Sequence, residues 1–396
     1  MKTGKDQRKA EEKGEKVLQS GKNKLYFETV FVLRIRDPRA ASRQGSYDKE
    51  QLFVDGGNDQ FFMREALREA ELGAGYTSPN PAVGAVVVRD GRIVGRGHHR
   101  FCGGPHAEIE AFLSLPHESD AAGADLYVTL EPCSTTGRTP PCCDAIIRNR
   151  IRRVVVGCLD PNPKHAGRGI GILRSAGIEV ETGILEEECR AHHEAFFKWI
   201  TAGRPFVLLK MAETLDGKIA AANGDSKWVT SETARERVAY LRRLSDAVLA
   251  GAETFRMDSP RFTARTPDGA VLKTPRRIIA THHPEILSGA GEGWESAVLD
   301  TPEDWRDFLA RLGREKVTML LIEGGGELAS SAIRARAVDK IEFHVAPKLL
   351  GGRGSRPVLG GPDPASLAEA VSLDRLRVSP LGCDLRIDAY PLYPES

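Results

Sequence analysis

The chain has 396 residues, enough for about two or three domains of ordinary size. Its 56 Lys and Arg against 55 Asp and Glu leave a formal net charge of +1, which argues against a broad basic surface for nucleic acid or an anionic membrane. Seven cysteines, an odd number in a long chain, favour a reducing compartment such as the cytoplasm, and no apolar run approaches the roughly 18 residues of a membrane span.

Residues 1–58 lack the apolar core of a secretory signal, and we expect a solvated, largely disordered extension with one candidate strand at 25–37. From residue 59 on, apolar periodicity predicts alternating helices and strands. In chain order these are a helix at 59–73, a hairpin at 81–99 that turns at Asp90-Gly91, a helix at 106–115, a strand at 124–133, a helix at 142–150, a strand at 152–160, and a helix followed by a strand at 169–183.

A Gly-Arg-Pro turn at 203–205 precedes a new apolar run, so the domain boundary is placed there, between a first domain at 59–204 and a second at 205–396. The second half alternates again, which predicts α/β domains with mainly parallel sheets covered by helices. Its strands are expected within 205–220, 246–255, 276–283, 316–326 and 339–352, and its helices at 231–244, 303–313 and 327–336.

The segments PHAE (105–108) and EPCSTTGRTPPCC (131–143) carry the side chains of a catalytic zinc site. The imidazole of His106 and the thiolates of Cys133 and Cys142 would fill three corners of a tetrahedron, which leaves the fourth corner to water. Glu108 is then no ligand but a general acid/base, which takes a proton from the water and passes it to a leaving amine. H-x-E followed by P-C is the order of zinc deaminases, although eight residues separate these cysteines where two are usual.

Each part alone has a simpler interpretation. An isolated H-x-E is usually an ordinary surface helix turn, and a Cys-Cys pair is usually packing; only the ordered combination favours zinc. The other cysteines are expected to be small buried hydrophobes, and the two His pairs to be surface or loop residues: Cys102, Cys158, Cys189 and Cys383, with His98-His99 and His192-His193.

The segment VTMLLIEGGGELASSAI (317–333) predicts a strand, a glycine turn and a helix. Glycines let a backbone approach a phosphate, and the first N–H groups of a helix favour an anion. The segment is no G-x-G-x-x-G, so a Rossmann site is not indicated and an ordinary loop remains the alternative.

Five segments together resemble the bifunctional riboflavin-biosynthesis deaminase/reductase family: SPNPAVGAVVV, PHAE, VTLEPCSTTGRTPPCCDAI, DPNPKHAGRGI and LKMAETLDGKIA. The resemblance implies a cytidine-deaminase-like α/β/α domain followed by a dihydrofolate-reductase-like α/β domain. It implies Zn²⁺-dependent deamination of 2,5-diamino-6-(5-phosphoribosylamino)pyrimidin-4-one, then NADPH-dependent reduction of the ribosyl group to ribityl.

The resemblance also implies the residues of both sites. NADPH would contact Ala212, Trp228, Thr254, Asp258, Thr281, Gly325 and Gly326. Substrate would contact Asn80, Ser226, Arg242, Phe262, Arg265 and Glu323, and we expect Lys210 and Asp258 near the reacting carbon. The chain departs from the family pattern at Thr135-Thr136, where a His pair is common, at Ser259 and at Ala280.

Three other hypotheses stay open at this point. The second domain could be a degenerate scaffold, the first could act on a nucleic-acid base, or the zinc site could be purely structural, with no role for Glu108. The sequence also leaves the oligomeric state open, although enzymes of this type often form homo-oligomers.

Overall fold

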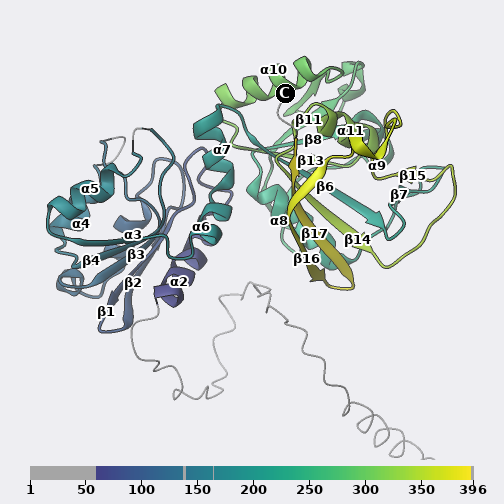
Figure 1. Cartoon of the computed structure of the whole chain (residues 1–396). Helices are drawn as coiled ribbons and strands as arrows, with labels where there is room; N and C mark the ends of the chain where they lie inside the picture. Colours follow the sequence, from purple (N-terminus) through teal and green to yellow (C-terminus); the bar gives the residue numbers. More distant parts are fainter. Residues whose placement is uncertain (1–58, 137–139, 164, 394–396) are drawn as a thin grey trace, which may run out of the picture. The chain divides into compact units, whose positions relative to one another are not determined.

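The structure is a computed structural model that describes residues 59–136, 140–163 and 165–393 (Figure 1). The predicted extension at 1–58, with its candidate strand at 25–37, lies outside these residues. Within the described part of the chain, no helix has both the length and the apolar character needed to cross a membrane.

The N-terminal part of the described chain contains a five-stranded sheet with the strand order β2-β1-β3-β4-β5. Its strands are β1 (Gly84–Arg89), β2 (Arg92–His98), β3 (Asp125–Leu130), β4 (Arg153–Cys158) and β5 (Glu179–Thr182). The helices are α2 (Asp59–Gly73), α3 (Ala107–Leu113), α4 (Cys142–Arg148), α5 (Arg168–Ser175), α6 (Glu186–His192) and α7 (Glu194–Ala202).

The predicted hairpin is β1–β2, an antiparallel pair. Its turn residues Asp90 and Gly91 have φ of 51° and 71°, the left-handed values of a type I′ turn. On β2, Gly97 has no side chain to separate the strand from α3, since a Cβ there would lie 2.2 Å from the Ala111 nitrogen. The hairpin therefore lets α3 pack directly on β2, and this contact places the first turn of α3.

Helices cover both faces of this sheet, as the two buried clusters show. On one face, side chains of α3, α4 and α5 such as Ala111, Ile146 and Leu173 pack against alternate residues of β1, β3 and β4. On the other face, Met63 of α2 and Cys189 of α6 pack against the residues in between. The fold is a three-layer α/β/α arrangement.

The C-terminal part contains an eight-stranded sheet with the order β12-β11-β8-β13-β6-β14-β17-β16 (Figure 1). Its strands are β6 (Phe206–Thr214), β8 (Ala247–Gly251), β11 (Arg276–Ala280), β12 (Trp294–Ala297), β13 (Met319–Glu323), β14 (Lys340–Ala346), β16 (Ser372–Leu381) and β17 (Asp384–Leu392). Short strands lie beside it: β7 (Lys218–Ala220), β9 (Ala264–Arg265), β10 (Val271–Lys273) and β15 (Arg356–Pro357). The helices are α8 (Glu232–Leu244), α9 (Ala252–Asp258), α10 (Pro302–Arg314) and α11 (Gly326–Arg334).

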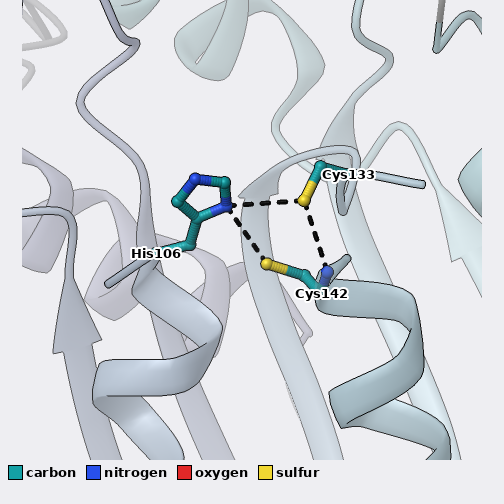
Figure 2. Close-up of side chains that lie close together, drawn as sticks. All are labelled: His106, Cys133 and Cys142. Carbon is teal, nitrogen blue, oxygen red and sulfur yellow. Dashed lines mark hydrogen bonds between the residues drawn. The ribbon is translucent and has the colours of Figure 1, made fainter. Parts of the chain in front are cut away.

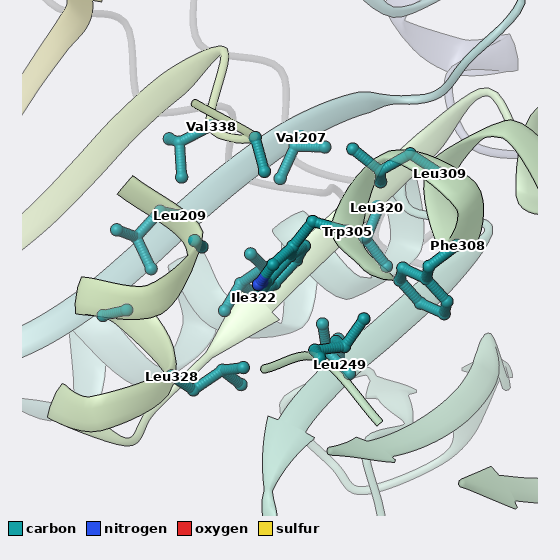
Figure 3. Close-up of a cluster of buried hydrophobic side chains, with 14 of the residues drawn as sticks. Val207, Leu209, Leu249, Trp305, Phe308, Leu309, Leu320, Ile322, Leu328 and Val338 are labelled. Carbon is teal, nitrogen blue, oxygen red and sulfur yellow. The ribbon is translucent and has the colours of Figure 1, made fainter. Parts of the chain in front are cut away.

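The core of this second sheet is centred on Trp305 of α10, which is fully buried (Figure 3). Its ring lies among aliphatic side chains of the central strands, including Leu320 and Ile322 of β13. Its indole N–H donates to the Ser331 hydroxyl on α11 at 3.0 Å, so the polar group of the tryptophan is satisfied inside the core. This contact joins α11 to α10.

The predicted α/β class is confirmed, as are the regular elements, but the expected strand directions hold only in part. In the second sheet, β6, β8, β11, β12, β13 and β14 pair in parallel. In the first sheet, β1 pairs antiparallel with both β2 and β3, so the expectation of a mainly parallel sheet was wrong there. The hairpin explains the β1–β2 pairing, because a two-residue turn can connect only antiparallel strands. The chain then passes through α3 and places β3 on the other side of β1, antiparallel to it.

Candidate functional site

The three predicted metal ligands come together at the carboxyl end of β3 (Figure 2). His106 immediately precedes α3, Cys133 follows β3, and Cys142 opens α4. The His106 Nδ1 atom lies 3.2 Å from the Cys142 sulfur and 3.4 Å from the Cys133 sulfur, and the three ligand atoms all lie within 4.8 Å of one another. One nitrogen and two sulfurs at this spacing can bind one tetrahedral metal ion.

The local electrostatics suit deprotonated sulfur. Hydrogen bonds from Cys142 and from His106 lower the pKa of Cys133 to about 4. The Cys142 backbone N–H also donates to the Cys133 sulfur at 3.3 Å. The hydrogen bond with Cys133, followed by burial, raises the pKa of Cys142. The two sulfurs thus share a proton. A metal cation bound between the sulfurs would replace this proton.

The structure also distinguishes the two adjacent cysteines. The Cys143 thiol turns away from His106 and donates to the carbonyl oxygens of Pro132 and Gly169, each at 3.7 Å. Burial raises its pKa to about 12, so it remains a thiol. The remaining cysteines fit the predicted burial only in part: Cys158 and Cys189 are buried, Cys102 is half-buried, and Cys383 is exposed, against expectation.

Glu108 lies in the first turn of α3, two residues after His106, and is 3% exposed. Burial and the neighbouring Cys133 raise the pKa of its carboxyl group, while His106 opposes this shift. Its carboxyl group also forms a hydrogen bond with the Cys142 side chain. A buried carboxyl group beside the ligands is placed to exchange protons with a molecule held there.

Asn80 is held by a histidine that sequence reasoning did not assign to the site. The His99 Nδ1 lies 2.8 Å from the Pro105 carbonyl oxygen, which can only accept, so Nδ1 carries the hydrogen. In the neutral ring, Nε2 then accepts from the Asn80 amide nitrogen at 3.1 Å. His99 is 2% exposed and its ring meets that of His106 edge-on. It lies in the loop after β2, so the expectation of a surface or loop residue holds for its place in a loop, although its side chain is buried. The same is true of His193, which is 2% exposed and lies in the turn between α6 and α7.

The second candidate site is a cleft of about 760 Å³ in the C-terminal part. It lies where β6, β8 and β13 end, the edge of a parallel sheet at which ligands commonly bind. All but two of the residues predicted to contact cofactor or substrate in this half line the cleft. Those that line it are Ala212, Ser226, Trp228, Arg242, Thr254, Asp258, Phe262, Glu323, Gly325 and Gly326. Lys210 lies in the same cleft, and burial lowers its pKa.

The glycine turn between β13 and α11 forms one wall of this cleft. Gly324 and Gly325 have φ of 73° and 85°, which side chains with a Cβ rarely adopt. A Cβ on Gly326 would lie 2.6 Å from the Pro357 carbonyl oxygen, so the first residue of α11 must also be glycine. The turn leaves the first backbone N–H groups of α11 close to the cleft, where an anionic group would be stabilised.

An ion pair and a cation–π pair shape the rest of the cleft. Arg242 donates from Nε and Nη2 to the two oxygens of Glu323, both at 2.7 Å, and its guanidinium lies 5.5 Å from the Phe262 ring centre. Arg235 lies 4.7 Å from the ring centre of Trp228, which is 64% exposed. Arg242, a predicted substrate contact, is therefore already paired with another predicted substrate residue, Glu323.

Two predicted contacts do not line the cleft. Arg265 lies on β9 and donates to the Thr263 hydroxyl and the Gly269 carbonyl, and Thr281 is buried after β11 and accepts from the His283 N–H. Conversely, Arg235 was missed, although it lies seven residues before Arg242 on α8 and so on the same helix face.

Comparisons with known proteins identify the family of each half of the chain. Residues 57–158 match the family described as cytidine and deoxycytidylate deaminase zinc-binding region, and residues 205–387 match the RibD C-terminal domain. The chain is 39% identical over 363 residues to riboflavin biosynthesis protein RibD of Actinobacillus pleuropneumoniae, covering 85% of this chain and 96% of the relative. It is 41% identical over 353 residues to RibD of Aquifex aeolicus, and the match covers 83% of this chain and 97% of the relative.

Two solved structures superpose over the same length. RibD of Acinetobacter baumannii gives a TM-score of 0.74 at 35% identity and covers 85% of this chain and 99% of its own. The diaminohydroxyphosphoribosylaminopyrimidine deaminase/5-amino-6-(5-phosphoribosylamino)uracil reductase of Thermotoga maritima gives a TM-score of 0.73 at 35% identity. This match covers 84% of this chain and 99% of the solved chain. With both catalytic parts aligned over nearly the full length of these relatives, the chain belongs to the RibD family of bifunctional riboflavin-biosynthesis deaminase/reductases.

Proposed function

We propose that this chain catalyses two consecutive steps of riboflavin biosynthesis, a hydrolytic deamination and then an NADPH-dependent reduction. The substrate of the first step is 2,5-diamino-6-(5-phosphoribosylamino)pyrimidin-4-one, and the second step converts the ribosyl group of the product to ribityl. The observation that carries the proposal is the cluster of His106, Cys133 and Cys142 beside the buried Glu108. The family relationship supports the second activity as well as the first.

In the deaminase, His106, Cys133 and Cys142 would hold Zn²⁺, through Nδ1 and two sulfurs. Bound zinc supplies a Lewis acid that lowers the pKa of water towards about 7. The Glu108 carboxylate accepts a proton from the attacking water and donates it to the exocyclic nitrogen, which leaves as ammonia. Asn80, oriented by His99, offers its amide oxygen to a donor on the pyrimidine.

In the reductase, NADPH supplies the hydride. Trp228, Thr254, Asp258 and the turn at Gly325-Gly326 would bind the cofactor. Ser226, Phe262 and the Arg242–Glu323 pair would bind the phosphoribosyl substrate, and Lys210 would face the carbon that accepts the hydride. Thr281 and Arg265 stay as proposed contacts from the family resemblance, although they do not line the cleft described above.

We assign the deaminase to residues 59–204 and the reductase to 205–396, preceded by an extension at 1–58. The matched regions 57–158 and 205–387 support this division. We place the enzyme in the cytoplasm, acting on small molecules as a homo-oligomer, with neither nucleic acid nor membrane as a partner. The net charge of +1 supports this choice over a nucleic-acid base deaminase, and the cleft lined by the expected residues supports it over a degenerate second domain.

Metal and ammonia analysis of the intact chain tests the deaminase. The purified protein should contain about one zinc per chain and release ammonia from the diaminopyrimidine. Cys133→Ser should lose both, because a hydroxyl is a poor substitute for a thiolate ligand, while NADPH oxidation with the deaminated substrate continues. Full zinc content and undiminished ammonia release in this variant would contradict the ligand assignment.

NADPH titration of the same intact chain, followed by cofactor fluorescence, tests the reductase. We expect saturable binding that weakens in Thr254→Ala. Absence of binding would favour the degenerate-scaffold hypothesis for the second domain.

A further inference from the structure

Glu131 is a buried carboxylate that neither proposed reaction uses. It follows the end of β3, lies two residues before Cys133, and is 4% exposed. No arginine or lysine forms an ion pair with it among the described residues. A buried acceptor of this kind is costly unless donors surround it, so the contacts of its two oxygens show its role.

Three backbone N–H groups donate to this carboxylate, those of Asp160 and Gly167 in the loop after β4 and that of Gly169 in the first turn of α5. The Gly169 nitrogen lies 3.0 Å from Oε1, and the nitrogens of Gly167 and Asp160 lie 2.9 and 3.3 Å from Oε2. These donors come from residues 29 to 38 positions further along the chain. One side chain therefore holds the loop that follows β4 against the turn that follows β3.

Further contacts of Gly169 and Cys143 join the same segments. Gly169 lies so close to the turn that a Cβ there would be 2.3 Å from the Pro132 carbonyl oxygen. The Cys143 thiol donates to the Gly169 and Pro132 oxygens, and the Cys143 N–H donates to the Cys133 carbonyl at 3.3 Å. The loop, the turn carrying Cys133 and the start of α4 thus form one contact, which we call the Glu131 clasp (Glu131, Cys143 and Gly169).

We propose that Glu131 is a positioning residue of the metal centre, and that the Glu131 clasp sets the separation of Cys133 and Cys142. The inference rests on the proposed function, because it concerns the zinc ligands of the deaminase. The eight residues between the two cysteines make a long connection, which does not fix their spacing by itself. The Glu131 clasp supplies this constraint through the backbone N–H groups of Asp160, Gly167 and Gly169.

The test is Glu131→Gln in the intact chain. Glutamine has the same shape, but its amide nitrogen carries hydrogens, so at least one of the three backbone N–H groups loses its acceptor. We expect zinc affinity, measured by chelator competition, and deaminase kcat/KM to fall by about 10- to 100-fold, as for other residues that support metal ligands. The cobalt-substituted variant should show shifted thiolate absorption bands, and the amides of Asp160, Gly167 and Gly169 should exchange hydrogen faster.

The reductase on the same chain reports whether the variant is folded, since its kcat and its KM for NADPH should not change. Glu179→Gln on β5 is the matched control, because that carboxylate is 64% exposed and lies on the same sheet. Gly169→Ala is a second route to the same result, since it disrupts the Glu131 clasp and keeps the carboxylate.

Zinc affinity and a cobalt spectrum equal to those of Glu179→Gln would overturn the proposal. So would a loss of reductase activity in parallel, which would mean that Glu131 supports the fold as a whole. Zinc affinity and amide exchange do not require turnover, so these outcomes are distinct from failure of the proposed function, in which the parent chain itself would release no ammonia.

Discussion

At the metal centre, Glu108 and Glu131 are both buried carboxylates, yet their surroundings give them different chemistry. The two oxygens of Glu131 accept hydrogen bonds from three backbone N–H groups, so Glu131 holds the segment that follows β4. Glu108 lies beside the ligands and shares a hydrogen bond with Cys142, so it can exchange a proton. The sequence predicts Glu108 because H-x-E is a local motif. It does not predict Glu131 or His99, because their partners are defined only by folding.

Glu108→Gln separates proton transfer from metal binding. The amide cannot accept and deliver a proton, so deaminase kcat should fall by about 10²- to 10⁴-fold. Zinc content should stay at that of the parent, because the ligands are intact, and NADPH oxidation should stay unchanged. Steady-state ammonia release and metal analysis check both expectations, and a parent-like kcat would favour the structural-zinc hypothesis.

His99→Ala should weaken substrate binding to the deaminase without removing the catalytic groups. Without the ring nitrogen that accepts from its amide, Asn80 loses its fixed orientation. One lost hydrogen bond of about 1–2 kcal/mol corresponds to a roughly 10-fold higher KM with a smaller change in kcat. His98→Ala, a change at the neighbouring position, is the control; equal effects from both would argue against the orienting role of His99.

At the scale of elements, the regular periodic segments were predictable and the irregular edges were not. Strands β8 and β13 and helix α10 have continuous or periodic apolar patterns because the core selects them. The long edge strand β16 was missed because it is almost entirely exposed, so no alternation marks it. Helix α7 was missed for a similar reason, since none of its residues is fully buried. Burial creates the patterns that sequence reasoning detects.

Strand β6 contains a carboxyl group that should make folding depend on pH. Glu213 is 9% exposed, its Oε2 has no hydrogen-bond partner among the described residues, and burial raises its pKa from 4.5 to about 7. Between these values the folded chain holds a proton that the unfolded chain releases, so the free energy of unfolding falls as pH rises through this window.

Glu213→Gln should remove this dependence. The variant should be about as stable as the parent near pH 4.5, and more stable by roughly 3 kcal/mol at pH 8. Urea unfolding at several pH values, followed by a probe in the reductase, measures the difference. An advantage that does not grow with pH would show that Glu213 has no raised pKa in the folded chain.

At the scale of the whole molecule, the two proposed sites share no residue within the described ranges. The metal centre is built from segments between residues 80 and 169, and the cleft from segments between 210 and 360. Each site also has its own sheet and its own buried core. The two activities should therefore be separable by removal of the metal as well as by mutation.

Removal of zinc by a chelator should abolish ammonia release and leave the reductase active. The deaminase should also lose stability, because Cys133 and Cys142 would share one proton where the cation had compensated both sulfurs. NADPH oxidation with the deaminated substrate, measured before and after chelation, reports the second site alone, and added zinc should restore ammonia release. If chelation instead stopped both reactions at the same rate, the reductase would depend on the metal centre, and the independence inferred from the separate residues would be wrong.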